Sequence, residues 1–156
     1  MVVLGRAVRD RRGGFTVIEL VMILGLIGIL ATIAVLVYGD ITERTRVAKA
    51  MADIVTLDSE ISTFEMMNER LPNDLAEINR AGFLDPWGHP YQYLNFAVSG
   101  NANCRKDLAL HPLNTEFDLY SMGKDGQSQA PLTASQSRDD IIRANDGQYV
   151  GLASNY

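Results

Sequence analysis

The feature that most constrains this chain is an apolar run near its amino terminus, residues 15–38, FTVIELVMILGLIGILATIAVLVY. The run has 24 residues and one charged side chain, Glu19. As a helix, about 20 apolar residues with a rise of about 1.5 Å each cover the hydrocarbon core of a bilayer, so the run predicts a membrane-spanning helix. The positive-inside rule predicts a cytoplasmic amino terminus, because four arginines precede the run: Arg6, Arg9, Arg11 and Arg12.

A cleaved secretory signal and a plain single-pass anchor are alternative interpretations of the same run. A secretory signal is disfavoured because its apolar region usually has about 7 to 15 residues and is followed by a small-x-small site. A plain anchor fits the hydropathy but does not explain Glu19. A carboxylate costs roughly 2.5 to 3.5 kcal/mol at the bilayer centre and less near the end of a span. Glu19 therefore either reaches the headgroups or has a task and a partner.

Length, charge and cysteine content limit what the rest of the chain can do. With 156 residues there is room for one compact domain beside the apolar run. Residues 15–156 carry 10 basic and 18 acidic side chains, a net charge of −8. Nucleic acid is not an expected partner, because phosphate backbones are bound by clustered Lys and Arg. The single cysteine, Cys104, excludes an intramolecular disulfide, and no zinc-ligand spacing is present.

The residues around Gly14 combine four features in a fixed register, RRGGFTVIE: a basic leader, Gly14, Phe15 after it, and Glu19 at the fifth position counted from Phe15. This pattern resembles the cleavage site of type IV prepilins and pseudopilins. The resemblance implies that a prepilin peptidase cuts after Gly14 and removes a leader peptide, residues 1–14. It also implies that the new amino terminus, Phe15, is N-methylated.

The same resemblance implies a role for Glu19 in assembly. In a filament core without water, the Glu19 carboxylate can pair with the Phe15 ammonium of a neighbouring identical subunit, because the two buried charges neutralise each other. Such a pair sets the axial register of the subunits. The chain departs from the family at Leu36, where the family often has a proline that breaks the helix. Local flexibility can come instead from three glycines: Gly25, Gly28 and Gly39.

After residue 38 the chain becomes polar but keeps a helical period. Apolar residues recur at steps of three, four or seven, interrupted by Asp58: Val47, Met51, Ile54, Ile61, Phe64 and Leu71. Residues 39–71 therefore predict an amphipathic helix that continues from the apolar run and ends at Leu71-Pro72. Residues 15–70 would then be one helix of about 84 Å. A coiled coil is disfavoured because the polar half offers only about four heptads.

Residues 72–156 are predicted to form a small globular head on which this helix packs. Residues 91–97 and 116–121, YQYLNFA and EFDLYS, alternate with aromatics and predict two antiparallel strands. The fold class is therefore α+β, with a short antiparallel sheet and a loop-rich C-terminal region. PNDLAEI predicts a turn and a short helix capped by Asn73 or Asp74, and residues 85–90 predict turns. His89 and His111 are interpreted as turn or surface residues.

Three blocks of the head resemble the major pseudopilin of type II secretion systems: LPNDLAEI, DPWGHPYQY and FDLYSMGKDGQ, followed by DDI. With the amino-terminal motif, the resemblance covers residues 15–142 and keeps the family's order of blocks. The chain departs from the family in two places. Residues 98–115 are longer than the usual connection, and the tail IIRANDGQYVGLASNY differs from the family's tryptophan-containing end. A related pilin-like branch with another task therefore stays open.

The head of that family binds one calcium ion, which takes six to eight oxygen ligands at about 2.3 to 2.6 Å. Asp125 and the pair Asp139-Asp140 bracket a 13-residue loop rich in Ser, Gln and Thr. The resemblance implies Asp125 and Asp140 as side-chain ligands and the carbonyls of Leu119 and Met122 as contributors, with Asp139 as a further candidate. A turn aspartate and solvated surface acids are the alternative interpretation.

Two classes of function fit the sequence. The first is a structural subunit of a pseudopilus that drives type II secretion across the outer membrane, or of a pilin-like surface filament. Its expected partners are identical subunits, the prepilin peptidase, the inner-membrane assembly platform and minor pseudopilins. It is expected in the bacterial inner membrane with its head in the periplasm, and then in a periplasmic or extracellular filament. The second class is a membrane-tethered binding module. An enzyme fits worst, because no catalytic arrangement of residues has suitable spacing.

Overall fold

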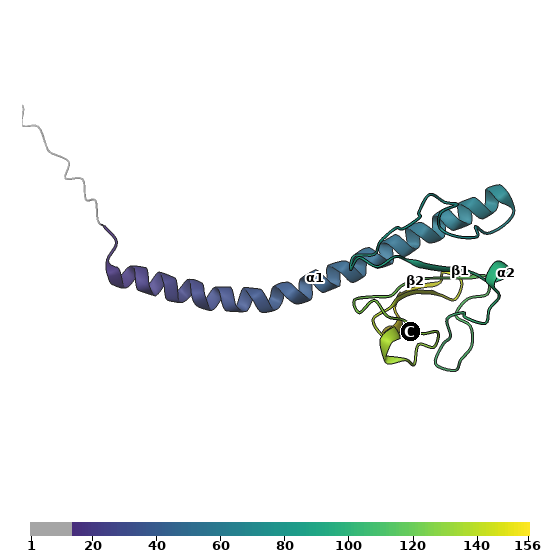
Figure 1. Cartoon of the computed structure of the whole chain (residues 1–156). Helices are drawn as coiled ribbons and strands as arrows, with labels where there is room; N and C mark the ends of the chain where they lie inside the picture. Colours follow the sequence, from purple (N-terminus) through teal and green to yellow (C-terminus); the bar gives the residue numbers. More distant parts are fainter. Residues whose placement is uncertain (1–13) are drawn as a thin grey trace, which may run out of the picture. The chain divides into compact units, whose positions relative to one another are not determined.

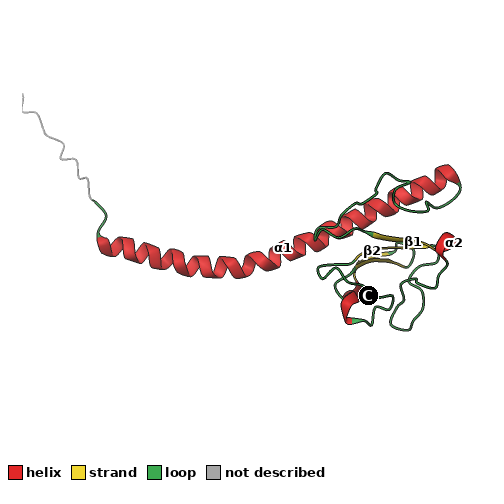
Figure 2. Ribbon diagram, viewed as in Figure 1, coloured by secondary structure: helices red, strands yellow, loops and turns green. Residues whose placement is uncertain are grey.

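The structure, a computed structural model, describes residues 14–156. In chain order it contains α1 (Val17–Asn68), β1 (Gln92–Asn95), α2 (Phe96–Ser99), β2 (Phe117–Ser121), η1 (Ser135–Ser137), β3 (Ile141–Ala144), β4 (Tyr149–Leu152) and η2 (Ala153–Asn155) (Figures 1 and 2). The predicted α+β class, with a long helix and a short antiparallel sheet, is confirmed. The chain divides into two compact units after Ile41, and α1 has a part in each.

The part of α1 in the first unit is mostly apolar, with Glu19 and Asp40 as its charged side chains. Its large apolar side chains from Val17 to Ile33 are between 45% and 82% exposed. The most apolar 18-residue stretch has a mean hydropathy of 3.0, and none of it is buried against the described protein. A helix with this surface needs an apolar surrounding. Within residues 14–156, α1 is the one helix long and apolar enough to cross a membrane, a property that a signal sequence shares.

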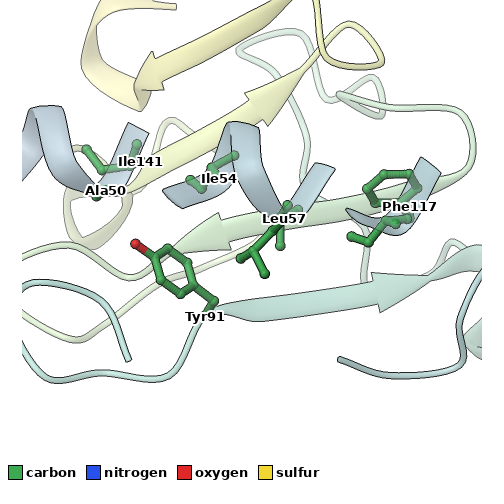
Figure 3. Close-up of a cluster of buried hydrophobic side chains, with 8 residues drawn as sticks. Ala50, Ile54, Leu57, Tyr91, Phe117 and Ile141 are labelled. Carbon is green, nitrogen blue, oxygen red and sulfur yellow. The ribbon is translucent and has the colours of Figure 1, made fainter. Parts of the chain in front are cut away.

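In the second unit, α1 supplies one side of the hydrophobic core. Ala50, Ile54, Leu57 and Ile61, spaced three or four residues apart, are fully buried. They form one cluster with side chains of the sheet and of the segment before it (Figure 3): Tyr91, Phe117, Leu119 and Ile141. The amphipathic helix predicted from the apolar period is therefore confirmed for this part of α1.

The ends of α1 lie two residues inside the predicted bounds. The helix begins at Val17, because Thr16 serves as its cap, and ends at Asn68. Glu69 has a φ of 54°, in the left-handed region, and directs the chain away from the helix axis before Leu71-Pro72.

The four strands form an antiparallel meander in the order β1-β2-β3-β4. Tyr93 pairs with Leu119, and Tyr120 pairs with Ile142. Leu119 and Ile141 belong to the cluster with α1, whereas Ile142 belongs to a second cluster with loop and C-terminal residues: Leu113, Leu132, Ala144 and Ala153. The sheet thus has α1 on one face and the long loops on the other.

The structure corrects three local predictions. Residues 96 and 97, predicted as the end of a strand, belong to α2, because Asn95 caps this helix by accepting the N–H of Ala97 at 2.9 Å. The segment after Pro72 forms turns instead of a helix: Asp74 accepts the N–H of Ala76 at 2.9 Å, but Asn79, with a φ of 60°, ends the turn. The C-terminal tail, predicted to be rich in loops, contains the hairpin of β3 and β4.

Candidate functional site

Thr16 and Glu19 form a capping box at the start of α1. The Thr16 hydroxyl oxygen accepts the Glu19 N–H at 3.3 Å. In return, Glu19 Oε2 accepts the Thr16 N–H at 2.9 Å and the Thr16 hydroxyl at 2.8 Å. These contacts satisfy N–H groups that every helix leaves unpaired in its first turn. The Thr-x-x-Glu spacing of this capping box is visible in the sequence.

The capping box places the Glu19 carboxylate beside the backbone of the residue that follows Phe15. Phe15 itself is 78% exposed, and Gly14 precedes the helix without regular structure. The predicted leader, apart from Gly14, lies outside the described residues. Contacts within a single chain thus orient the Glu19 carboxylate toward the amino-terminal end of the helix.

The predicted calcium loop brings Asp125 and Asp139 together. Asp139 Oδ2 accepts the Asp125 N–H at 3.0 Å, and Asp125 Oδ1 accepts the Gln127 N–H at 2.8 Å. Gly123 allows this approach: its φ is 64°, and a Cβ there would lie 2.3 Å from the Asp139 carbonyl oxygen. Of the two predicted carbonyl contributors, Leu119 lies in β2 with a fully buried side chain, and Met122 directly follows the strand.

Asp140 is bound differently from the other two aspartates. Its side chain is fully buried, and Oδ2 accepts a hydrogen bond from Arg105 Nη2 at 2.5 Å and one from the Ser128 hydroxyl at 2.7 Å. Burial raises the pKa of Asp140 to about 6, although Arg105 and Ser128 act to lower it. Arg105 is the cation that faces this carboxyl group.

A second buried carboxylate, Asp118, also binds Arg105, through the Arg105 backbone. Asp118 of β2 accepts the Arg105 N–H at 2.5 Å and an N–H of the Asn114 side chain at 2.9 Å. Burial raises the pKa of Asp118 above its ordinary value. Neither Arg105 nor Asp118 was singled out from the sequence, because no local pattern marks a loop arginine as the partner of distant acids.

The loop as arranged does not fit a calcium ion. Among residues 14–156, no group of three or more His, Cys, Asp or Glu side chains is placed to hold a metal ion. Asp139 Oδ2 accepts a backbone N–H, and Asp140 Oδ2 already pairs with a guanidinium, whose positive charge opposes a second cation nearby. The calcium site inferred from the resemblance stays a prediction.

The turn of residues 85–90 packs against the start of this loop. Asp85, which is buried, accepts the backbone N–H groups of Trp87 at 3.0 Å and His89 at 2.9 Å, and it accepts the Ser121 hydroxyl at 2.5 Å. The His89 ring nitrogen Nδ1 lies 3.1 Å from the Gly123 carbonyl oxygen. These contacts fit the structural role predicted for His89. Cys104 is a buried free thiol.

Comparison with known proteins places these features in a family context. The chain is 27% identical over 140 residues to type II secretion system core protein G of Pseudomonas aeruginosa, covering 76% of this chain and 88% of that protein. It is also 27% identical over 141 residues to the core protein G of Dickeya chrysanthemi, covering 88% and 89%. The corresponding protein of Aeromonas hydrophila is 27% identical over 141 residues, covering 77% and 88%.

The chain is similar to type II secretion system core protein G over most of its length. The resemblance inferred from the amino-terminal motif and the head blocks is thereby confirmed. No family model matches the chain. No solved structure matches it either.

Proposed function

We propose that this chain is the major subunit of a pseudopilus, a filament that polymerises to drive type II protein secretion across the outer membrane. The observation that carries the proposal is a single carboxylate, Glu19, in the first turn of a helix whose other side chains in that unit are mostly apolar and exposed. The similarity to core protein G over most of the chain supports the same function. The relatives are named as secretion components, which agrees with a structural role.

Processing after Gly14 is part of the proposal. A prepilin peptidase removes residues 1–14 on the cytoplasmic side, and Phe15 becomes an N-methylated amino terminus. Two features support accessibility of the cut: Phe15 is 78% exposed, and Gly14 lies outside α1. Cleavage there creates a cation at Phe15, four residues before Glu19.

Assembly follows from the charges at this end of the helix. In a filament core without water, Glu19 of one subunit pairs with the Phe15 ammonium of the next, and the pair offsets the cost of burying either charge. The capping box supports this proposal because it holds the Glu19 carboxylate toward the amino-terminal end of its helix. The partners are identical subunits, minor pseudopilins and the inner-membrane assembly platform.

The proposed location is the bacterial inner membrane, with the helix of the first unit as a single span and the head in the periplasm. The hydropathy and exposure of α1 support the span, and the four leader arginines support the orientation. After assembly, the subunit resides in a periplasmic filament. A pilin-like filament outside the cell and a tethered binding module are the competing functions.

Mass spectrometry of the protein from a membrane fraction tests the processing step. The expected result is a chain that begins at Phe15 and carries one N-methyl group. A chain that begins after residue 30 would indicate a secretory signal. An uncut chain in cells with an active prepilin peptidase would indicate a plain anchor, and either result contradicts the proposal.

A further inference from the structure

Arg105 is a buried charge that comes from the long connection of residues 98–115. Its side chain is 3% exposed. The guanidinium lies over the Tyr120 ring, with 4.4 Å between Cζ and the ring centroid. A guanidinium is seldom buried unless acceptors and a counter-charge surround it. Its partners therefore indicate what this arginine does.

The acceptors of Arg105 come from the loop that follows β2 and from the residue before β3. Nη1 donates to the Ser128 hydroxyl and, at 2.7 Å, to the Gln129 carbonyl oxygen. Nη2 donates to Asp140 Oδ2 at 2.5 Å. One cation thus binds a hydroxyl, a carbonyl and a carboxylate that lie up to 12 residues apart in the sequence.

This set of oxygens is the kind that a hard divalent cation binds in irregular loops. One acceptor is left over: Asp140 Oδ1 is buried and has no hydrogen-bond partner within residues 14–156. Without the guanidinium, neither oxygen of the buried Asp140 carboxylate would contact a positive charge. Arg105 and a divalent cation therefore compete for the same acceptors.

We propose that Arg105 is a built-in counterion that occupies the position of a divalent cation beside Asp140, so that the head holds its C-terminal loop without bound metal. The arginine supplies one positive charge and directed N–H donors to Asp140, Ser128 and Gln129. Its backbone ties the same residue to β2, since the Arg105 N–H donates to Asp118 at 2.5 Å. The positive charge beside Asp140 therefore comes from the long connection, residues 98–115, which contains Arg105.

The test is thermal melting of the full-length protein in detergent micelles, followed by the fluorescence of Trp87. This residue is the only tryptophan of the chain, and its indole N–H donates to Glu43 at 3.1 Å, so its signal reports on the second unit. The melting temperatures of the wild-type protein in calcium chloride and in chelator should differ by less than about 1 °C. A folded protein that binds no calcium gains no stability from calcium. The calcium site inferred from resemblance leads to the opposite result, stabilisation by calcium and a lower melting temperature in chelator.

Arg105→Ala supplies the second arm. It should melt several degrees below wild type in chelator and recover part of the loss in calcium chloride, with a smaller recovery in magnesium chloride. Lys106→Ala is the matched control, because it removes the same charge from the next residue and should show no calcium response. The double variant Arg105→Ala with Asp140→Asn should lose the calcium response that Arg105→Ala gains.

Each outcome decides the proposal. Calcium stabilisation of wild type by several degrees would overturn it, and so would an Arg105→Ala variant that melts at the same temperature in calcium and in chelator. If Arg105→Ala shows no cooperative transition in chelator, a transition restored by calcium supports the proposal. The absence of a restored transition contradicts it. The wild-type comparison stands even if that variant does not fold.

Discussion

Arg143 of β3 donates from Nε to Asp58 Oδ1 of α1 at 2.5 Å, which joins the sheet to the helix inside the second unit. The Arg143 side chain is 7% exposed, and its guanidinium lies 4.0 Å above the Phe117 ring centroid. A second contact runs from Nη1 to the Asn114 side-chain oxygen at 3.2 Å. Asp58, which interrupts the apolar stripe of the helix, is thus the counter-charge of a buried arginine.

Replacing Asp58 should destabilise the head strongly. Asp58→Ala leaves the buried Arg143 with only its longer ion pair, 3.9 Å from Asp146, and loss of one member of a buried pair costs about 3 to 5 kcal/mol. Because Asp58 is 26% exposed, water reaches the site and the loss should lie near the lower end, at about 3 kcal/mol. Denaturant unfolding of the full-length protein in micelles, followed by Trp87 fluorescence, measures it.

Ser59→Ala is the control for this prediction. Ser59 is exposed on the next position of the same helix, and the change should alter the unfolding free energy by less than about 0.5 kcal/mol. Equal stability of Asp58→Ala and Ser59→Ala would mean that the ion pair contributes nothing measurable.

Three variants separate the charge of Glu19 from its capping role. Glu19→Gln keeps a side chain that can close the capping box but removes the charge, Glu19→Val removes both, and Thr16→Ala keeps the charge while losing the cap. An unpaired Phe15 ammonium in an apolar filament core costs about 3 to 5 kcal/mol for each subunit, whereas a lost cap costs about 1 kcal/mol. Both Glu19 variants should therefore abolish most filament assembly, and Thr16→Ala should retain most of it.

The readout for this series is filament yield at equal membrane abundance, with processing checked by mass. All three variants should insert and be cut. If Glu19→Gln forms filaments at the wild-type level while Thr16→Ala does not, the helix cap is the important contribution and the charge pair is refuted.

A third prediction concerns Glu60 and Arg80, which dock the segment after Pro72 onto α1. Arg80 Nε donates to Glu60 Oε2 at 2.7 Å, and Nη2 donates to Oε1. The hydrogen bond from Arg80 lowers the pKa of Glu60 below its ordinary value. A lowered pKa in the folded state means that the pair stabilises the head above about pH 4.3 and that this contribution is lost as the pH falls further.

Glu60→Gln should therefore reduce the unfolding free energy by about 0.5 to 1 kcal/mol at neutral pH. The difference from wild type should shrink as the pH falls below about 4.3, because wild-type Glu60 itself then takes up a proton. Glu69→Gln, at an exposed position just beyond α1, should change the unfolding free energy at neutral pH by less than about 0.5 kcal/mol. A Glu60→Gln deficit that grows toward acid would contradict the assigned pair.

The long helix and the strand pair β1 and β2 could be predicted because their sequences repeat with the period of the structure. Ile54 and Ile61 mark the buried helix face, and the aromatic alternation of YQYLNFA and EFDLYS marks the two strands. These signals are local, so they need no knowledge of the rest of the chain. Glu19 was recognised from a motif at a fixed position.

The hairpin of β3 and β4 was missed because its first strand does not alternate. All four residues of β3 are buried, and one of them is Arg143, whose burial depends on a carboxylate 85 residues away. The turn did carry a signal: Asn145 and Asp146 both have positive φ, as Asn-Asp-Gly sequences at hairpin turns often do. No local sequence pattern could predict that Arg105 is buried, because its ion-pair partner, Asp140, lies 35 residues further along the chain.

The central claim is that this chain polymerises. Immunoelectron microscopy of filaments from cells that express it, with the secretion ATPase present or deleted, tests this claim most directly. The account predicts labelled filaments that contain the cut chain when the ATPase is present, and cut chain dispersed in the inner membrane when it is deleted. A correctly cut chain that stays dispersed in the membrane of cells with an active ATPase would contradict the account and favour a tethered binding module.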